Sequence, residues 1–237
     1  MQFQGDIPVL STGQMVEVDR LMIEEFNISL VQMMENAGRN LAELARRKLG
    51  GHVAGQRIAI LSGAGNNGGG GLAAARHLHN WGAKISLVLA VNPQWLKDVP
   101  AHQWQILQKI GIVPDEHQDL EKAALIIDAL IGYGLKGDPR QPVAGWIDKA
   151  NNAGRPILAL DVPSGLDTTS GIPGNPSIKA EATLTLALPK SGLLTTQAAD
   201  YVGELYLADI SVPRELYQHI GVEVPNLFVS DSIVQVG

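Results

Sequence analysis

Six short segments of this chain are continuously apolar, and they alternate with segments of helical periodicity. The six segments are about Arg57–Leu61, Lys84–Ala90, Ala124–Asp128, Pro156–Asp161, Ala182–Ala187 and Glu204–Ala208. A strand that lacks alternating polar residues is buried on both faces, and burial on both faces requires helices above and below a parallel sheet. The pattern therefore predicts a mostly parallel central sheet with a helical layer on either side.

Two further helices are predicted before the first strand. The spacing of a capping box at Ser11 predicts a helix over about Thr12–Glu25, and a second is predicted over about Leu30–Leu49. On the second helix, core packing is the favoured interpretation of Met33 and Met34, and lining of a ligand pocket is the alternative. We therefore expect an α/β fold: a Rossmann-like three-layer α/β/α sandwich with extra N-terminal helices.

Length and composition limit the classes of function. The chain has 237 residues, of which 45% are hydrophobic and 18% charged, as is typical of a folded domain. No repeat or linker-like tract interrupts it, so we expect a single domain over residues 1–237 with a core over about 11–213. The formal charge of −6 argues against nucleic-acid binding. The absence of cysteine excludes disulfides and thiolate chemistry.

The sequence gives no sign of a leader or a membrane anchor. The segment Met1–Asp6 has neither a basic start nor an apolar run. No later stretch approaches the roughly 18 uninterrupted apolar residues that span a bilayer. We expect a cytoplasmic protein that does not bind membranes.

The segment after the first predicted strand is unusually rich in glycine. Gly63–Gly71 contains six glycines in nine residues, and a helix over about Leu72–Trp81 is predicted to follow it. A glycine-rich loop at a helix N-terminus turns backbone N–H groups toward an anion, where the helix dipole also favours negative charge. The segment predicts a phosphate-binding loop, and a plain tight turn is the alternative.

The segment differs from both standard nucleotide-binding loops. Residues 65–70 have the glycine spacing of a Walker A loop, but the Lys and the Ser or Thr that must follow are absent. Residues 63–68 satisfy the dinucleotide fingerprint, yet the second strand ends without the acidic residue that holds a ribose. The first mismatch excludes a nucleoside triphosphatase. The second leaves an NAD-dependent oxidoreductase as a weaker alternative.

Charged residues follow three other predicted strands. Asp128 and Asp161 each end a buried strand, and Lys190 comes shortly after the strand over about Ala182–Ala187. A carboxylate at the end of a buried strand is costly unless it has a partner or a ligand. Because the carboxyl ends of parallel strands share one edge of the sheet, these residues predict a functional site there. For Lys190, a solvated surface lysine is the alternative.

Five segments together resemble a known family. They are Met34–Gly38, Gly65–Gly69, Asp128–Gly134, Asp161–Asp167 and Leu186–Lys190. Their order and spacing are similar to those of the YjeF N-terminal domain, the NAD(P)H-hydrate (NAD(P)HX) epimerases, and the resemblance extends over roughly residues 11–213. It implies an isomerase that interconverts the R and S epimers of hydrated NADH and NADPH in nicotinamide-nucleotide repair.

The resemblance also implies residue roles. By position, the substrate-binding residues are Asn66, Asn67, Gly68, Gly69, Gly70, Gly132, Tyr133, Gly134, Leu135, Lys136, Gly137, Asp138 and Asp161. The implied ligands of a bound potassium ion are Asn67, Asp128 and Ser164. Their amide, carboxylate and hydroxyl oxygens are hard donors of the kind that such a cation prefers. The chain departs from the family at Gly70, where the family loop carries Asp.

The implied reaction indicates which side chains to consider as catalytic. Loss of the hydroxyl from C6 of the nicotinamide ring leaves an iminium ion, and water returns on the other face. The reaction needs an acid for the departing hydroxyl and a carboxylate that supports the cation and activates water. Asp161 and Lys190 are the candidates, and the assignment of the two roles between them stays open.

The resemblance suggests partners as well as a site. It implies a homodimer, formed through the N-terminal helices. A dehydratase is commonly fused to this domain in bacteria, and because the 237 residues leave no room for one, we expect a separate dehydratase. A non-catalytic nucleotide- or RNA-binding scaffold of the same fold is the other class to consider. The presence of Asp128, Asp161 and Lys190 argues against it.

Overall fold

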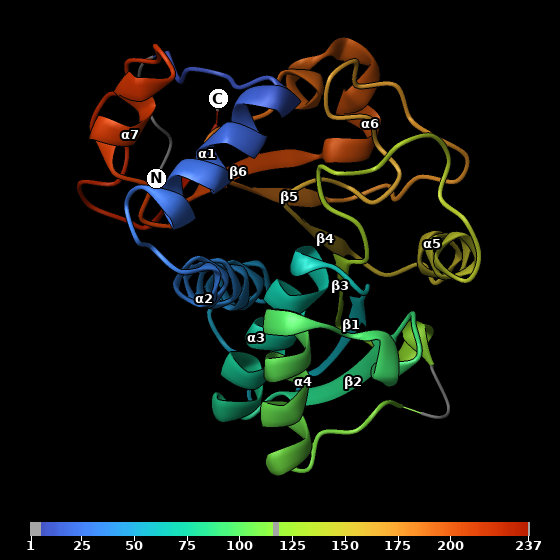
Figure 1. Ribbon diagram of the computed structural model, residues 1–237. Coiled ribbons are helices and arrows are strands. Elements are labelled where there is room, and N and C mark those ends of the chain that lie inside the picture. The colour runs from blue at the N-terminus through green and yellow to red at the C-terminus, as the bar shows by residue number, and fades with distance from the viewer. Residues whose placement is uncertain (1–5, 116–118, 237) are drawn as a thin grey trace.

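The computed structural model describes residues 6–115 and 119–236. Residues 1–5, in which the sequence predicts no leader, lie outside the described residues. In the described part of the chain, a seven-stranded sheet runs through the molecule in the order β2-β1-β3-β4-β5-β6-β7 (Figure 1). The strands are β1 Arg57–Ser62, β2 Lys84–Leu89, β3 Leu125–Ala129, β4 Ile157–Leu160, β5 Ala182–Leu186, β6 Glu204–Ala208 and β7 Ile233–Gln235.

Strands β1 to β6 pair in parallel, which confirms the fold class that the apolar segments predict. Strand β7 pairs antiparallel with β6, Val234 lying opposite Leu207. The sequence analysis did not predict β7, because a three-residue strand carries too little pattern to be distinguished from a loop. Its position is fixed by the neighbouring strand and not by its own residues.

Helices cover both faces of the sheet (Figure 1). They are α1 Thr12–Glu24, α2 Leu30–Lys48, α3 Asn66–Asn80, α4 Asp98–Lys109, α5 Val143–Asn152, α6 Ala199–Val202 and α7 Arg214–His219. On one face, α2, α3 and α4 share a core cluster with β1 and β3 that includes Leu41, Leu72 and Ile60. On the other face, Ile147 and Ala150 of α5 pack against alternate residues of β1, β3 and β4. The result is the three-layer arrangement.

The two N-terminal helices agree closely with their predicted bounds. The predicted capping box is present at Ser11, whose hydroxyl oxygen accepts a hydrogen bond from Gln14 N while Gln14 Oε1 accepts one from Ser11 N. Ser29 and Gln32 form a second capping box at the start of α2. Helix α1 packs with α7 and with residues that follow β5 and β6, among them Leu188 and Ile210. The extra helices therefore lie near the carboxyl edge of the sheet.

The prediction of a long glycine loop before α3 was wrong. The helix begins at Asn66, so Gly68–Gly71 lie within its first turns and are buried. Close packing accounts for the glycines: a Cβ atom at Gly71 would lie 2.6 Å from the Cβ atom of Ala129 on β3. A Cβ atom at Gly68 would lie 2.0 Å from the carbonyl oxygen of Gly63. These glycines let the start of α3 approach the sheet, and the true loop is short.

Candidate functional site

A cavity of about 510 Å³ opens at the carboxyl ends of β1, β3 and β4. The connection after β1 runs through α3 on one face of the sheet, and the connection after β3 runs through α5 on the opposite face. Ligands bind at such a reversal in open α/β sheets, because the two diverging loops leave a crevice between them. Residues of α1 and α2 complete the wall. Met33 and Met34 are buried in the core, as the favoured interpretation predicts, and they also line this cavity.

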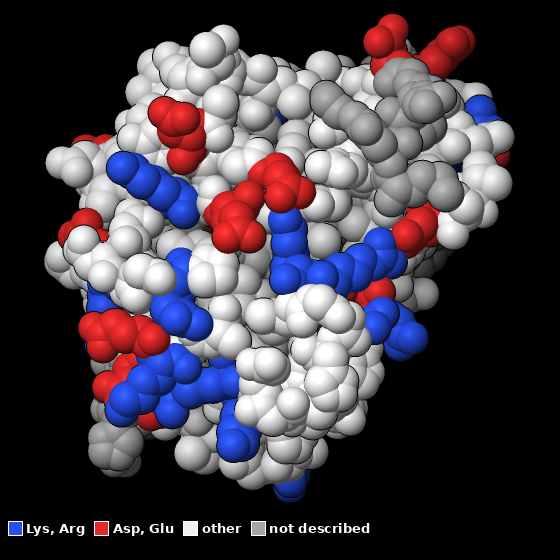
Figure 2. All heavy atoms as spheres, turned by 180° about the vertical axis from the view of Figure 1, so that it is seen from behind, with Lys and Arg blue, Asp and Glu red and all other residues white. Residues whose placement is uncertain are grey.

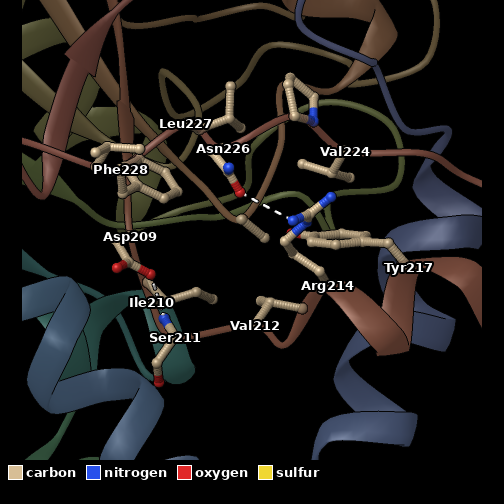
Figure 3. Close-up of a pocket in the computed structure, with 13 residues that line it drawn as sticks. Asp209, Ile210, Ser211, Val212, Arg214, Tyr217, Val224, Asn226, Leu227 and Phe228 are labelled. Atoms are coloured by element: carbon tan, nitrogen blue, oxygen red, sulfur yellow. Dashed lines mark hydrogen bonds between the residues drawn. The ribbon is translucent and has the colours of Figure 1, made fainter.

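A second cavity of about 360 Å³ lies between α7 and the C-terminal segment (Figure 3). Its walls are mainly apolar, and at its rim Arg214 donates a hydrogen bond of 2.9 Å to Asn226 Oδ1. The described lining of this cavity includes none of the residues that the sequence analysis singled out. The larger cavity is therefore the candidate functional site.

Asp161 stands directly after β4 and is buried in the wall of the larger cavity. Its φ angle is +66°, in the left-handed region that Asp and Asn adopt more readily than other side chains. The backbone is held there by a hydrogen bond of 2.7 Å from Asp161 N to Leu184 O on β5. Strained backbone of this kind is often found at functional sites, where it directs a side chain.

Lys190 is the largest fully buried side chain in the described part of the protein. Its Nζ atom donates to Asp161 Oδ1 at 2.5 Å, to Leu186 O at 3.0 Å and to Thr185 Oγ1 at 3.3 Å. The interpretation of Lys190 as a solvated surface lysine was therefore wrong. Because three acceptors match the three ammonium protons, no proton of Lys190 remains to point into the cavity.

The pair formed by Asp19 and Tyr133 was missed by the sequence analysis. The Tyr133 hydroxyl donates a short hydrogen bond to Asp19 Oδ2, and both residues line the cavity. The ring of Tyr133 also lies near the ammonium group of Lys190, with Nζ 5.9 Å from the ring centroid. A signal was present in α1: Asp19 lies at helical spacing between Met15 and Met22, on the apolar face where a carboxylate is out of place.

Burial shifts the titration of this pair. It raises the pKa of the Asp19 carboxyl, and although the hydrogen bond from Tyr133 opposes the rise, the charge of Asp161 adds to it. Burial also raises the pKa of the Tyr133 hydroxyl well above its usual range, as does the neighbouring charge of Asp19. Asp19 therefore binds a proton more readily than an exposed aspartate does.

Asp128 lies below the cavity wall and is completely buried. Its carboxylate accepts hydrogen bonds from Ser164 Oγ at 2.7 Å, Ser164 N at 2.8 Å and Leu130 N at 3.1 Å. Burial raises the pKa of Asp128 to about 6, even though all three hydrogen bonds favour the ionised form. The structure thus brings Asp128 and Ser164, two of the three implied cation ligands, into direct contact.

The third implied ligand, Asn67, reaches the same region from the first turn of α3. Among the described residues, its buried Nδ2 atom has no hydrogen-bond partner. Nδ2 carries N–H donors, so the partner it lacks is an acceptor such as a phosphate oxygen or water, and a cation would be held by Oδ1 instead. One carboxylate, one hydroxyl and one amide oxygen make a hard-oxygen donor set, so these residues fit a monovalent hard cation. Gly132 lies between this amide and the Asp161 carboxylate, because its Cβ atom would be 3.3 Å from Asn67 Cβ and 3.4 Å from Asp161 Oδ2.

The remaining residues implied for substrate binding divide into two groups. Asn66, Asn67, Gly70, Gly132, Tyr133 and Gly134 line the larger cavity together with Asp161. The other members lie outside it. Gly68 and Gly69 are buried within α3, Lys136 is exposed, and Leu135, Gly137 and Asp138 line a separate hollow of about 290 Å³. Asp138 Oδ1 accepts a hydrogen bond of 2.9 Å from Asn175 N, which holds this end of the loop away from the cavity.

The charged side chains of the surface are interspersed. On the face in Figure 2, Lys and Arg lie beside Asp and Glu, and no broad surface of one sign covers that face. Arg47, for example, pairs with Asp231 at 2.8 Å and with Glu43 at 2.9 Å. That face therefore carries no continuous basic surface of the kind that a nucleic-acid backbone requires. None of the described helices combines the length and the apolar character needed to cross a bilayer.

Comparison with known proteins gives consistent matches. The family model for the YjeF-related protein N-terminus matches residues 30–192. The NAD(P)H-hydrate epimerase of Dehalogenimonas lykanthroporepellens is 41% identical over 219 residues, which cover 92% of this chain and 87% of that relative. The bifunctional NAD(P)H-hydrate repair enzyme Nnr of Moorella thermoacetica is 37% identical, but the match covers 88% of this chain and 41% of the relative. The chain thus spans about two fifths of such bifunctional relatives.

A solved structure shows the same architecture. The crystal structure of the yeast protein ynu0 (YNL200c) matches with a TM-score of 0.81 and 27% sequence identity. The match covers 97% of this chain and 100% of the yeast chain. The three-layer fold and the arrangement of its connections are therefore shared with a protein of known structure.

Proposed function

Since the chain belongs to the family of YjeF-related protein N-termini, we infer that it is an isomerase of nicotinamide-nucleotide repair. Its substrates in this proposal are hydrated NADH and hydrated NADPH, and its reaction interconverts the R and S epimers at C6 of the nicotinamide ring. The observation that carries the proposal is the Asp161–Lys190 pair, which places a carboxylate with fixed orientation in the wall of the cavity.

The lining of the cavity suits two parts of a dinucleotide, its phosphates and its nicotinamide ring. Asn66 and Asn67 begin α3 at the cavity, where the free N–H groups of the first helical turn attract phosphate oxygens. Met34, Tyr133 and Asp161 line the cavity as well, and they offer apolar and aromatic surface beside a carboxylate. We place the pyrophosphate at the start of α3 and the hydrated nicotinamide ring against Asp161.

The chemistry requires a negative group beside the positive intermediate. When the hydroxyl leaves C6, the lone pair of the ring nitrogen forms a carbon–nitrogen double bond, and the ring becomes an iminium cation. The Asp161 carboxylate stabilises that cation and takes the proton of the water that adds to C6. Lys190 holds the Asp161 side chain in one orientation, so Lys190 acts as a positioning residue.

A potassium ion held by Asn67, Asp128 and Ser164 is the finer part of the proposal. Asp128 and Ser164 are in contact, and Asn67, which lines the adjoining cavity, carries an amide oxygen that would complete the donor set. When bound, the ion would supply positive charge that offsets Asp128 and attracts the substrate phosphates. The protein should then melt at a higher temperature in KCl than in equal LiCl, because a ligand of the folded state alone stabilises that state.

Two variants make the salt comparison specific. Asp128→Ala should remove the difference between KCl and LiCl, and Asp148→Ala, at an exposed carboxylate on α5, should leave the difference unchanged. Identical melting curves of the parent in the two salts would contradict the potassium site.

We also propose a homodimer and a dehydratase partner. Val16 and Ile23 are 54% and 45% exposed, and because they are seven residues apart on α1 they lie on one side of the helix. This apolar side is the proposed dimer contact, so Val16→Glu should lower the mass measured by sedimentation.

A dehydratase specific for one epimer would consume the product of this site, which gives epimerisation its purpose.

The decisive test follows a single epimer. Purified S or R hydrated NADH is incubated with the protein, and the ratio of the two epimers is followed by chromatography. We expect the ratio to approach equilibrium much faster than in buffer, and Asp161→Asn should remove most of the acceleration. A well-folded parent that binds NADPH but does not change the ratio would point to a non-catalytic binding domain instead.

A further inference from the structure

Epimerisation through water loss and return needs two groups that handle protons, one for the departing hydroxyl and one for the incoming water. Asp161 supplies one of them. Lys190 does not supply the second, because its three protons are directed to Asp161, Leu186 O and Thr185 Oγ1 and its side chain is 0% exposed. The second group must therefore come from elsewhere in the wall of the cavity.

On the basis of the proposed epimerase function, we infer that Tyr133 and Asp19 form the second acid–base pair of the site. In this pair the Tyr133 hydroxyl is the catalytic group that exchanges a proton with the reacting oxygen. Asp19 is the positioning residue behind it, and it holds or releases that proton through its hydrogen bond to Tyr133.

The contacts of the two residues support this assignment. Asp19 reaches the cavity from α1 and Tyr133 from the loop after β3, so two separate elements converge on one hydrogen bond. Both residues line the same cavity as Asp161. The Tyr133 ring also packs near Lys190 Nζ, which places the pair beside the Asp161–Lys190 pair. Together the four residues make a contiguous polar cluster, with Asp19, Tyr133 and Asp161 in the wall of the cavity and Lys190 buried behind it.

The step balances without any other reactant. In one direction Asp19 begins protonated, so its acid proton is donated to the Tyr133 oxygen and the Tyr133 proton is free to turn toward the substrate. The C6–oxygen bond breaks and its electron pair goes to oxygen, which takes the Tyr133 proton and leaves as water. The Asp19 carboxylic acid then returns a proton to Tyr133. A water molecule adds to C6 on the other face and gives its proton to Asp161. In the opposite direction the two pairs exchange roles, and solvent restores their protons between turnovers.

The charges around Asp19 are consistent with a proton-holding role. The groups that face it are Tyr133, Asp161 and Lys190. Burial and the charge of Asp161 raise the pKa of Asp19, and they outweigh the Tyr133 hydrogen bond and the charge of Lys190, which lower it. Its helical neighbour Arg20 pairs with Glu17, Glu24 and Glu25 instead. On α7, His219 faces Glu25.

The test compares Asp19→Asn, Tyr133→Phe and the double variant with the parent. Asn keeps an oxygen that can accept the Tyr133 hydrogen bond, and Phe keeps the ring that packs near Lys190, so both variants should fold and bind NADPH. We expect kcat for epimerisation to fall by about 10²-fold or more in each single variant, with little change in KM. The double variant should be no slower than the slower single variant, because the two residues act as one unit.

A pH profile separates proton transfer from a structural role. At one fixed KCl concentration, the parent profile of kcat should contain a limb that Asp19→Asn removes and Asp19→Glu retains. The matched control is Glu24→Gln on the exposed side of α1, which should match the parent. If the parent and Asp19→Asn epimerise equally fast, this inference is overturned and the proposed function stands. A parent that does not epimerise would overturn the proposed function, and the inference with it.

Discussion

Lys190 Nζ lies 2.5 Å from Asp161 Oδ1, and the two side chains are 0% and 6% exposed. The two residues are 29 positions apart and follow the neighbouring strands β4 and β5. A buried ion pair contributes little net stability, but the loss of one partner leaves the other charge buried without compensation. Replacement of either member should therefore lower stability, and replacement of Asp161 should also remove the proposed acid–base group.

Asp161→Asn should remove most of the activity, and it should lower stability as well because the buried Lys190 ammonium loses its counter-charge. Asn tolerates the φ angle of +66° and keeps an acceptor oxygen for Lys190, but it carries no charge and takes no proton. We expect the epimerisation rate to fall about 10²- to 10⁴-fold, with circular dichroism and NADPH binding near those of the parent. Full activity in the folded variant would exclude Asp161 as the acid–base group.

Lys190→Met should lower the free energy of unfolding far more than a surface substitution does. Methionine fills most of the volume but leaves the Asp161 carboxylate buried without its cation. Removal of one member of a buried pair costs about 3–5 kcal/mol. Urea unfolding of Lys190→Met measures this cost, and Lys179→Met at an exposed position serves as the control. Equal stability of the two variants would mean that the Asp161 charge is compensated in another way.

Two glycines in helices should respond to alanine in opposite directions. Gly71→Ala places a Cβ atom 2.6 Å from the Cβ atom of Ala129, so α3 must move away from β3 at a cost of about 1–3 kcal/mol. Gly13→Ala on the exposed side of α1 meets only Ser11 Oγ at 4.0 Å, and it should stabilise by about 0.5–1 kcal/mol. Thermal or urea unfolding gives both values, and a neutral effect at Gly71 would contradict the packing account of the glycine run.

The family's aspartate at position 70 should be accepted only with a compensating change. A Cβ atom at Gly70 would lie 2.8 Å from Leu160 Cδ2, so Gly70→Asp alone should destabilise by about 1–3 kcal/mol. Leu160→Val removes the obstructing methyl group, and the double variant should recover part of this loss. In the double variant a hydrogen bond from substrate to the new carboxylate, about 1.5–3 kcal/mol, should tighten NADPH binding roughly 10- to 150-fold. Calorimetric titration of the four proteins would show no such gain if the position does not contact the ligand.

Stability should fall as the pH rises through the titration of Asp128. Its folded pKa of about 6 exceeds the value of 3.8 that is usual for an exposed aspartate, so between these values the folded protein binds the proton more tightly than the unfolded chain does. By linkage, a shift of about 2 pH units corresponds to about 3 kcal/mol, which is present below pH 4 and lost above pH 6. The free energy of unfolding should be measured from pH 4 to 8 in a potassium-free buffer. Asp128→Asn should lower the free energy of unfolding at every pH. It should also reduce the dependence of that free energy on pH, and an unchanged pH dependence would show that Asp128 is not its source.

Several features could be predicted from the sequence because their signals are local. The capping box at Ser11 is contained within four residues, and each of the six apolar segments carries its own indication of burial. The chain order of these elements then leaves few ways to arrange a parallel sheet. Asp128 and Asp161 could be placed at one edge because every strand of a parallel sheet ends on that side.

The start of α3 could not be predicted from local preference. Four consecutive glycines have poor helix propensity, so the sequence favours a loop where the structure has a helix. The packing of α3 against Ala129 and against Met34 of α2 overrides that propensity, because only glycine permits so close an approach. Strand β7 was missed for a related reason: pairing with β6 defines it, and its three residues do not.

The sequence by itself determined the fold class, the family and the edge of the sheet at which the site lies. Only the tertiary structure decided that Lys190 is buried against Asp161, that Asp19 of α1 meets Tyr133, and that the outer half of the loop over residues 132–138 turns away from the main cavity. The physical reason is the range of the interactions. Hydrophobic periodicity and capping act within one element, whereas burial and ion pairing depend on contacts between elements far apart in the chain.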